Sequence, residues 1–257
     1  MCSDGGAIVR DLAFECAGQN GKVSITLHDE PYLTDGHDDH TAVGVQSWGA
    51  SIVLGRMLAR SPESFGLSTA AAQPLRVLEL GAGTGLLGML IAKLCPAATV
   101  VATDYHPRVL ENLNRNVELN FAAGSRAPMV ERLDWADVAR GDHAAADAFA
   151  RPFDLVFAAD VLYAAEHARL LQAVVHQYLL RQSADAVFHM LGPVRRTQEH
   201  LVAVAEVDRV FPDSSNVLSS ASERTLVVKK REWIAKTRGT GREDESGYWH
   251  WTIGWQQ

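Results

Sequence analysis

Apolar residues in the middle of the chain alternate between short continuous runs and positions spaced three or four apart. The short runs are typical of buried strands and occupy residues 76–80, 99–103, 153–159 and 186–191. Helical spacing follows them at residues 86–94, 107–120, 170–178 and 200–211. Strands that alternate with helices predict an α/β fold, in which helices cover both faces of a parallel sheet.

The N-terminal part has a different pattern. Residues 7–14 and 22–28 are strand-like and flank a turn at residues 18–21 that contains two glycines, which predicts a β-hairpin. Residues 61–74 and 136–152 show no regular period, so we expect loops there.

The C-terminal part predicts a second, antiparallel hairpin. Residues 224–233 and 248–255 are strand-like, and the glycine-rich, charged residues 238–247 between them predict a mobile loop. In the last strand a period of two places four large side chains on one face: Trp249, Trp251, Ile253 and Trp255.

Composition excludes several classes of protein. Hydrophobic residues make up 47% of the 257 residues and charged residues 21%, as in folded globular proteins. No apolar run approaches the roughly 18–20 residues that cross a bilayer, and residues 1–10 lack the order of a signal peptide. The three cysteines are far apart, which argues against disulfides and zinc. A net charge of −7 argues against nonspecific nucleic-acid binding. We expect a cytoplasmic or nuclear monomer without membrane or nucleic-acid partners.

A glycine-rich turn between a strand and a helix is the sharpest motif. Residues 77–86 read Val-Leu-Glu-Leu-Gly-Ala-Gly-Thr-Gly-Leu, so Gly81, Ala82 and Gly83 let a backbone approach a ligand closely. Leu86 stands where a phosphate loop needs lysine and where a dinucleotide fingerprint needs its third glycine. Glu79 adds a carboxylate beside the turn, which suits a cationic ligand without a pyrophosphate. S-adenosylmethionine, with its sulfonium and ammonium groups, meets that requirement.

Carboxylates at two further strand ends extend this prediction. Asp104 ends the next strand, close to the roughly 20-residue separation at which a carboxylate accepts both ribose hydroxyls. Its alternative role is to cap the helix that begins at Pro107. Asp134 and Trp135 stand where the following sheet strand should end, and they predict an adenine site. The alternative there is a surface turn with a half-buried tryptophan.

These segments resemble the seven-β-strand methyltransferases, and within them the family-16 (methyltransferase-like 21 type) protein-lysine methyltransferases. The resemblance rests on residues 45–54, 77–86, 107–120, 133–135 and 153–163. It implies a Rossmann-like, mostly parallel seven-stranded sheet with an antiparallel C-terminal hairpin. It also implies one methyltransferase domain over residues 1–257, in which residues 1–42 form a hairpin extension and residues 43–257 the cofactor-binding core.

The resemblance also implies roles for individual residues. S-adenosylmethionine would be lined by Trp48, Gly81, Ala82, Gly83, Asp104, Trp135 and Ala159. Asp160 and Tyr163, from an Asp-x-x-Tyr motif, would stand where cofactor and acceptor meet. The alternative for Trp48 is a core side chain, and for Asp160 and Tyr163 a helix cap and a core tyrosine.

A lysine acceptor must lose a proton before it attacks, and burial favours the neutral amine. We therefore expect Asp160 to orient the acceptor or cofactor rather than to act as general base. The family modifies translation elongation factors and chaperones, which makes a translation elongation factor the expected protein substrate. A small-amine methyltransferase, for a nicotinamide-like base, and a catalytically silent cofactor-binding module remain as alternatives. None of the ten histidines predicts a metal site.

Overall fold

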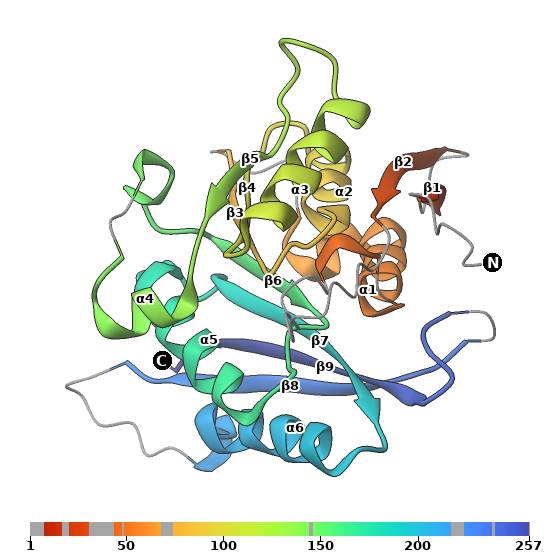
Figure 1. The fold of residues 1–257 in the computed structure, drawn as a ribbon. Coiled ribbons are helices and arrows are strands. Elements are labelled where there is room, and N and C mark those ends of the chain that lie inside the picture. Colours follow the sequence, from red (N-terminus) through yellow and green to blue (C-terminus); the bar gives the residue numbers. More distant parts are fainter. Residues whose placement is uncertain are drawn as a thin grey trace.

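A seven-stranded sheet forms the centre of the molecule (Figure 1). The computed structural model describes residues 8–16, 21–30, 44–47, 49–67, 74–143, 146–216, 224–237 and 240–256. In spatial order the strands are β5 (Met129–Arg132), β4 (Thr99–Asp104), β3 (Arg76–Leu80), β6 (Leu155–Ala159), β7 (Val187–Arg195), β9 (Glu245–Trp255) and β8 (Leu226–Ala235). The first five are parallel, and β9 is antiparallel to both of its neighbours. This confirms the predicted sheet and C-terminal hairpin.

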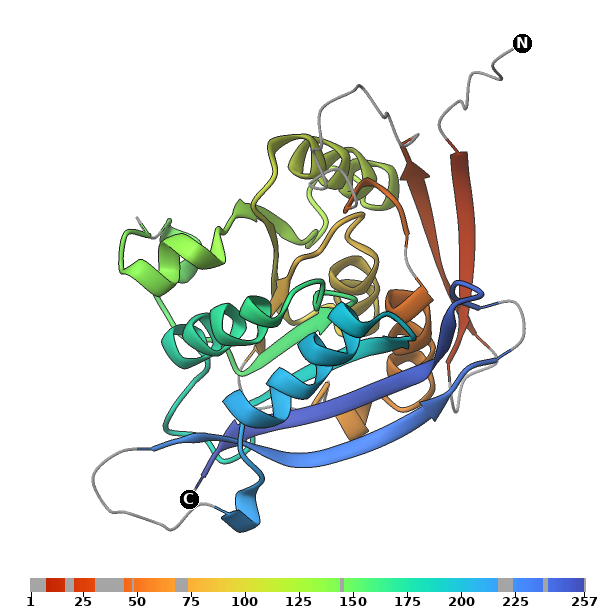
Figure 2. The same ribbon diagram turned by 60° about the horizontal axis from the view of Figure 1, so that its bottom comes forward.

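Helices cover both faces of the sheet, as predicted (Figures 1 and 2). One face carries α1 (Gly49–Arg60), α2 (Leu86–Leu94) and α3 (Pro107–Asn120), and the other carries α4 (Trp135–Arg140), α5 (Ala165–Tyr178) and α6 (Gln198–Val210). None of the helices in the described part of the chain is long and apolar enough to cross a membrane.

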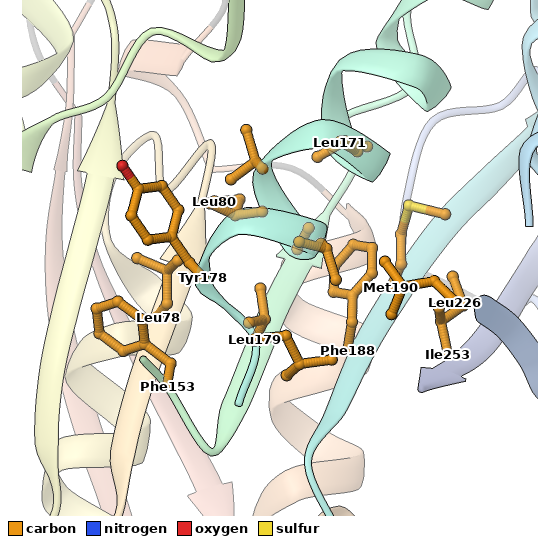
Figure 3. Packing of buried hydrophobic residues seen from close by; sticks show 14 of the residues in the cluster. Leu78, Leu80, Phe153, Leu171, Tyr178, Leu179, Phe188, Met190, Leu226 and Ile253 are labelled. Carbon is orange, nitrogen blue, oxygen red and sulfur yellow. The ribbon is translucent and has the colours of Figure 1, made fainter. Parts of the chain in front are cut away.

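The core under α5 and α6 joins residues of six strands, and Figure 3 shows part of it. Its members include Leu78, Leu80, Phe153, Leu171, Tyr178, Leu179, Phe188, Met190, Leu226 and Ile253. Trp251, Ile253 and Trp255 of β9 are buried in the same cluster and Trp249 packs against it, which confirms the predicted tryptophan face. Burial of each such side chain contributes about 1.5–3 kcal/mol.

The predicted N-terminal hairpin consists of β1 (Ile8–Glu15) and β2 (Lys22–Asp29), while residues 17–20 of its turn lie outside the described residues. The hairpin buries Phe14, Ile25 and Leu27 in an apolar cluster with the helices, and polar contacts add to its docking on α3. Asn116 accepts from the backbone N–H of His28 at 2.7 Å, and Asn120 exchanges two hydrogen bonds with the backbone of Thr26. Asn112 donates to the His28 carbonyl. Asparagines spaced four apart lie on one helix face and thus bind alternate residues of β2 along the edge that faces away from β1.

Three sequence expectations are wrong in part. Residues 136–140 belong to helix α4, which Asp134 caps at its start and Gly141 ends in a left-handed conformation. The helix lacks an apolar period because it has no buried residue. Residues 62–65, expected as loop, form a 3-10 turn. Glu245 lies in β9 and is buried, whereas the charged composition of residues 238–247 predicted a mobile loop.

Candidate functional site

The glycine turn links the end of β3 to the start of α2. Gly81, Gly83 and Gly85 all have positive φ, at 62°, 55° and 83°, a conformation that residues with a Cβ adopt at a cost. A Cβ on Gly83 would lie 2.9 Å from the carbonyl oxygen of Gly44, so the two segments touch through backbone alone. The turn therefore presents main-chain atoms rather than side chains to its neighbours.

Glu79 supports this turn from beneath. Strand alternation directs its neighbours Leu78 and Leu80 toward α5 and leaves Glu79 on the face that α2 covers. Its carboxylate accepts the Gly88 N–H at 2.8 Å, one of the N–H groups that a helix start leaves without a partner. Burial raises the pKa of Glu79 to about 8, although bonds from the Gly88 and Leu87 N–H groups oppose the rise.

Asp104, at the end of β4, joins the turn to the next strand. Its Oδ2 accepts the Gly83 N–H at 3.2 Å, and its Oδ1 accepts the N–H groups of Tyr105 and His106 at 2.8 and 3.2 Å. Burial raises the pKa of Asp104, and these three bonds oppose it. The residue thus shapes both the turn and the approach to α3.

A cavity of about 670 Å³ opens at the carboxyl ends of these strands. Nine of the predicted site residues line this cavity: Gly81, Ala82, Gly83, Asp104, Asp134, Trp135, Ala159, Asp160 and Tyr163. Glu79 is not among the lining residues, and Trp48 lies outside the described part of the chain.

The sequence did not single out several residues of the wall, including Gln46, Tyr105, Val161, His167 and Glu199. Gln46 lies two positions before Trp48, inside the segment that carries the resemblance, so proximity was a usable signal. Glu199 comes from α6, which follows β7 and lies far along the chain from the glycine turn, and no local pattern marks it as a site residue.

The cavity is acidic. Among the lining residues that the structure describes are the carboxylates of Asp104, Asp134, Asp160 and Glu199, and neither lysine nor arginine occurs there. Such a wall attracts cations and repels a pyrophosphate. The volume lies within the roughly 300–1,000 Å³ usual for small-molecule sites.

Three aromatic rings form one side of the cavity. The His167 ring meets Trp135 edge-on at 6.1 Å and Tyr163 edge-on at 6.0 Å. Its Nδ1 accepts the backbone N–H groups of Tyr163 and Ala164 at 3.1 and 3.3 Å, so His167 caps α5. Burial lowers the pKa of His167, which agrees with a neutral ring that accepts at Nδ1. Tyr163 is 45% exposed, so its alternative role as a core tyrosine is wrong.

Asp160 follows β6. Among the described residues other than glycine, Asp160 alone has a positive φ, of 55°. It is 3% exposed, and its carboxylate binds Arg195 of β7 rather than capping a helix. Burial raises the pKa of Asp160 to about 6, Arg195 lowers it and Glu245 raises it. The described residues contain no cluster of three or more His, Cys, Asp or Glu side chains placed to hold a metal ion.

Comparison with known proteins places this geometry in a family. The family model described as "Lysine methyltransferase" matches residues 27–202, which include the glycine turn, Asp104 and the Asp160–Tyr163 motif. The chain belongs to the lysine methyltransferase family. This confirms the family resemblance seen in the sequence.

Curated relatives agree with this assignment. The chain is 31% identical over 197 residues to protein-lysine N-methyltransferase EEF2KMT of Mus musculus, covering 72% of this chain and 54% of the relative. It is 28% identical over 191 residues to protein-lysine N-methyltransferase EFM2 of Saccharomyces cerevisiae, covering 69% and 42%. The chain thus spans about half the length of the curated relatives it matches.

A solved chain from Galdieria sulphuraria, named as a sarcosine dimethylglycine methyltransferase, shares the fold. It has a TM-score of 0.51 and 10% identity, with 79% of this chain and 85% of that chain covered.

Proposed function

We propose that this chain is a protein-lysine N-methyltransferase that uses S-adenosylmethionine. The observation that carries the proposal is the acidic cavity, where the glycine turn, Asp104, Trp135 and the Asp160–Tyr163 motif of a lysine methyltransferase meet. Asp160 and Tyr163 line the same cavity as the turn, as the reaction requires of groups between cofactor and acceptor.

The residues present fit this cofactor on two counts. The carboxylates and the absence of basic side chains from the described wall suit a ligand that carries a sulfonium and an ammonium group. Gly81 and Gly83 line the cavity with positive φ, and a Cβ at either would meet a neighbouring segment at 2.9 Å, so the turn keeps this shape only with glycine. Gly81, Ala82 and Gly83 would hold its amino-acid part, Asp104 the ribose hydroxyls, and Asp134, Trp135 and Ala159 the adenine. Trp48 is proposed as a further contact, and Glu79 as a support of the turn.

S-adenosylmethionine, when bound, supplies a methyl group on a positively charged sulfur. The protein's part is to align the acceptor and to exclude water. Tyr163, half exposed at the cavity, offers an aromatic face to the lysine side chain. Asp160 holds the acceptor amine or the cofactor by a hydrogen bond, and burial of the acceptor amine favours its neutral form.

We propose a translation elongation factor as the acceptor, and a cytoplasmic location with it. The relatives named EEF2KMT and EFM2 support this choice, as does the family resemblance. The whole of residues 1–257 would act as one domain.

The test is transfer of radioactive methyl groups from the cofactor to three sets of acceptors: purified translation elongation factors, calmodulin, and small amines including nicotinamide. Peptide mass spectrometry then locates the methylated position. We expect label on a lysine of an elongation factor, and no label with Asp160→Asn although that variant binds the cofactor. Label on calmodulin alone would overturn the choice of acceptor. Label on small amines alone, or cofactor binding without transfer to any acceptor, would overturn lysine methylation.

A further inference from the structure

Asp160 is joined to a buried row of charged and polar groups that do not line the cavity. Asp160, Arg195 and Glu245 are 3%, 9% and 3% exposed. Asp160 directly follows β6, and the other two lie in the next two strands of the sheet, β7 and β9. Neither Arg195 nor Glu245 lines the cavity, and their hydrogen bonds lead to it through Asp160.

One nitrogen of Arg195 makes all its contacts to these carboxylates. Nη2 lies 2.9 and 2.8 Å from Oδ1 and Oδ2 of Asp160, and 3.4 Å from Oε1 of Glu245. The hydroxyl of Tyr248 donates to Oε2 of Glu245 at 2.8 Å and fixes the second carboxylate. Nε of Arg195 is buried and has no hydrogen-bond partner in the described structure. A buried donor left unpaired costs about 1–3 kcal/mol, so the arrangement favours the contacts of Nη2 over full pairing of the guanidinium.

The backbone of Asp160 is constrained as well. Its φ of 55° is a conformation that few residues with a Cβ adopt, and its N–H donates to the Leu191 carbonyl at 3.0 Å. Residues held in this way cluster at functional sites, where surrounding contacts fix them. Both the main chain and the carboxylate of Asp160 are therefore fixed by β7.

We propose that Arg195 is a positioning residue for methyl transfer: it fixes the Asp160 carboxylate at the cavity wall, and Glu245 adjusts the charge there through Arg195. This proposal rests on the proposed function. A lone carboxylate would stabilise an acceptor ammonium, whereas a carboxylate paired with a guanidinium has less net charge to do so. Arg195 thus lets Asp160 accept a hydrogen bond without holding the acceptor in its protonated form.

The pKa of Asp160 reports on this network. Burial raises it to about 6, Arg195 lowers it and Glu245 raises it, so the two neighbours act in opposite directions. The charged and titratable groups that face Asp160 or its partner are Arg195, Glu245, Tyr248, Arg242, Tyr163 and His200. A substitution that only loosens the fold has no reason to reproduce these opposite signs.

The test is a carbon-13 NMR titration of the Asp160 carboxyl in protein labelled at aspartate, with its resonance assigned by its loss in Asp160→Asn. Arg195→Met should raise the midpoint by about 1 to 3 pH units, because it removes an opposite charge in contact. Glu245→Gln should lower the midpoint. Arg195→Lys, which keeps one charged nitrogen, should return it toward the wild-type value.

The controls come from another buried carboxylate, whose arginine partner is 75% exposed. Glu206 is 4% exposed and pairs with Arg209 at 2.8 Å on α6. Glu206→Gln and Arg209→Met should leave the Asp160 midpoint unchanged. Equal or same-sign shifts in Arg195→Met and Glu245→Gln would overturn the proposal. If Arg195→Met does not fold, Glu245→Gln and Arg195→Lys decide: an unmoved midpoint in Glu245→Gln overturns it.

Turnover separates this proposal from the proposed function. This test uses an acceptor that the wild-type protein methylates. Arg195→Met should lower kcat at least 10-fold at pH 7, while the dissociation constant of the demethylated cofactor stays within 3-fold of the wild-type value. Unchanged kcat would refute the role of Arg195 and leave the methyltransferase assignment standing. Opposite NMR shifts without methylation of any acceptor would instead support the network and overturn the assignment.

Discussion

A pair of stacked histidines in the core makes the stability of this protein depend on pH. Substitution of His189 alone can measure its contribution to that dependence. His189 of β7 is 3% exposed, and its ring stacks on Phe157 at 5.2 Å and on His250 at 5.4 Å. Nδ1 of His189 and Nε2 of His250 are 3.2 Å apart, so one proton lies between them. Burial, and secondarily His250, lowers the pKa of His189 from 6.5 to about 3.

The sign follows from which state binds the proton. As the pH falls below 6.5 the unfolded chain protonates His189, whereas the folded chain does not until about pH 3. The free energy of unfolding therefore decreases as the pH falls through this window. Between pH 7 and pH 5 the loss is about 2 kcal/mol, from 1.5 pH units at about 1.36 kcal/mol each.

The assay compares urea unfolding of the wild type and His189→Gln at both pH values. A comparison is needed because Glu79 and Asp160, whose pKa values are raised by burial to about 8 and about 6, change stability in the opposite sense over the same range. In His189→Gln, the stability lost between pH 7 and pH 5 should be smaller by about 2 kcal/mol, or about 0.7 M in midpoint for an m-value near 3 kcal/mol/M.

Phe188→Leu is the control, since Phe188 is equally buried in the same strand and does not titrate. Its stability difference from the wild type should be the same at both pH values. If the difference between His189→Gln and the wild type is also equal at pH 7 and pH 5, within about 0.5 kcal/mol, the reasoning from burial is refuted.

Three further substitutions test the site and its support. Trp135→Ala should weaken binding of the demethylated cofactor at least about 10-fold in calorimetry, as expected for loss of a base-stacking ring; unchanged affinity would remove Trp135 from the adenine site. Gly81→Val adds about 1–3 kcal/mol of backbone strain at φ 62° and places a Cβ 2.9 Å from a valine methyl, so cofactor binding should be lost. Asn116→Ala leaves a backbone N–H and a backbone carbonyl unpaired and should cost about 2–4 kcal/mol in urea unfolding. A cost below 1 kcal/mol would contradict the role of the Asn116 hydrogen bonds in holding the hairpin.

The sequence predicted those features of the fold and the site that depend on residues close together in the chain. The order of strands and helices, the glycine turn and the strand-end position of Asp104 follow from local patterns, and the structure brings this turn and Asp104 together. Glu79 shows a limit of that reading. Its position beside the turn suggested contact with a ligand, but the alternation of the strand directs its carboxylate to Gly88 of α2.

The partners of Asp160 could not be predicted because they depend on strand insertion. Arg195 reaches Asp160 from the adjacent strand, and Glu245 reaches Arg195 only because β9 inserts between β7 and β8. In the sequence Glu245 stands in a glycine-rich, charged stretch that is typical of an exposed loop. Its burial involves Tyr248, three positions later in β9, and Arg195 of β7, and no local period reveals the contact with Arg195.

The asparagines of α3 also have a consequence for self-association. An edge strand offers a row of free N–H and C=O groups to any other extended chain, which makes it a template for aggregation. In this protein β1 pairs with one edge of β2, and Asn116 and Asn120 bind the backbone of the other. A foreign strand would have to displace a helix before it could add to β2 on that side, so that edge of the hairpin is closed to further strand pairing.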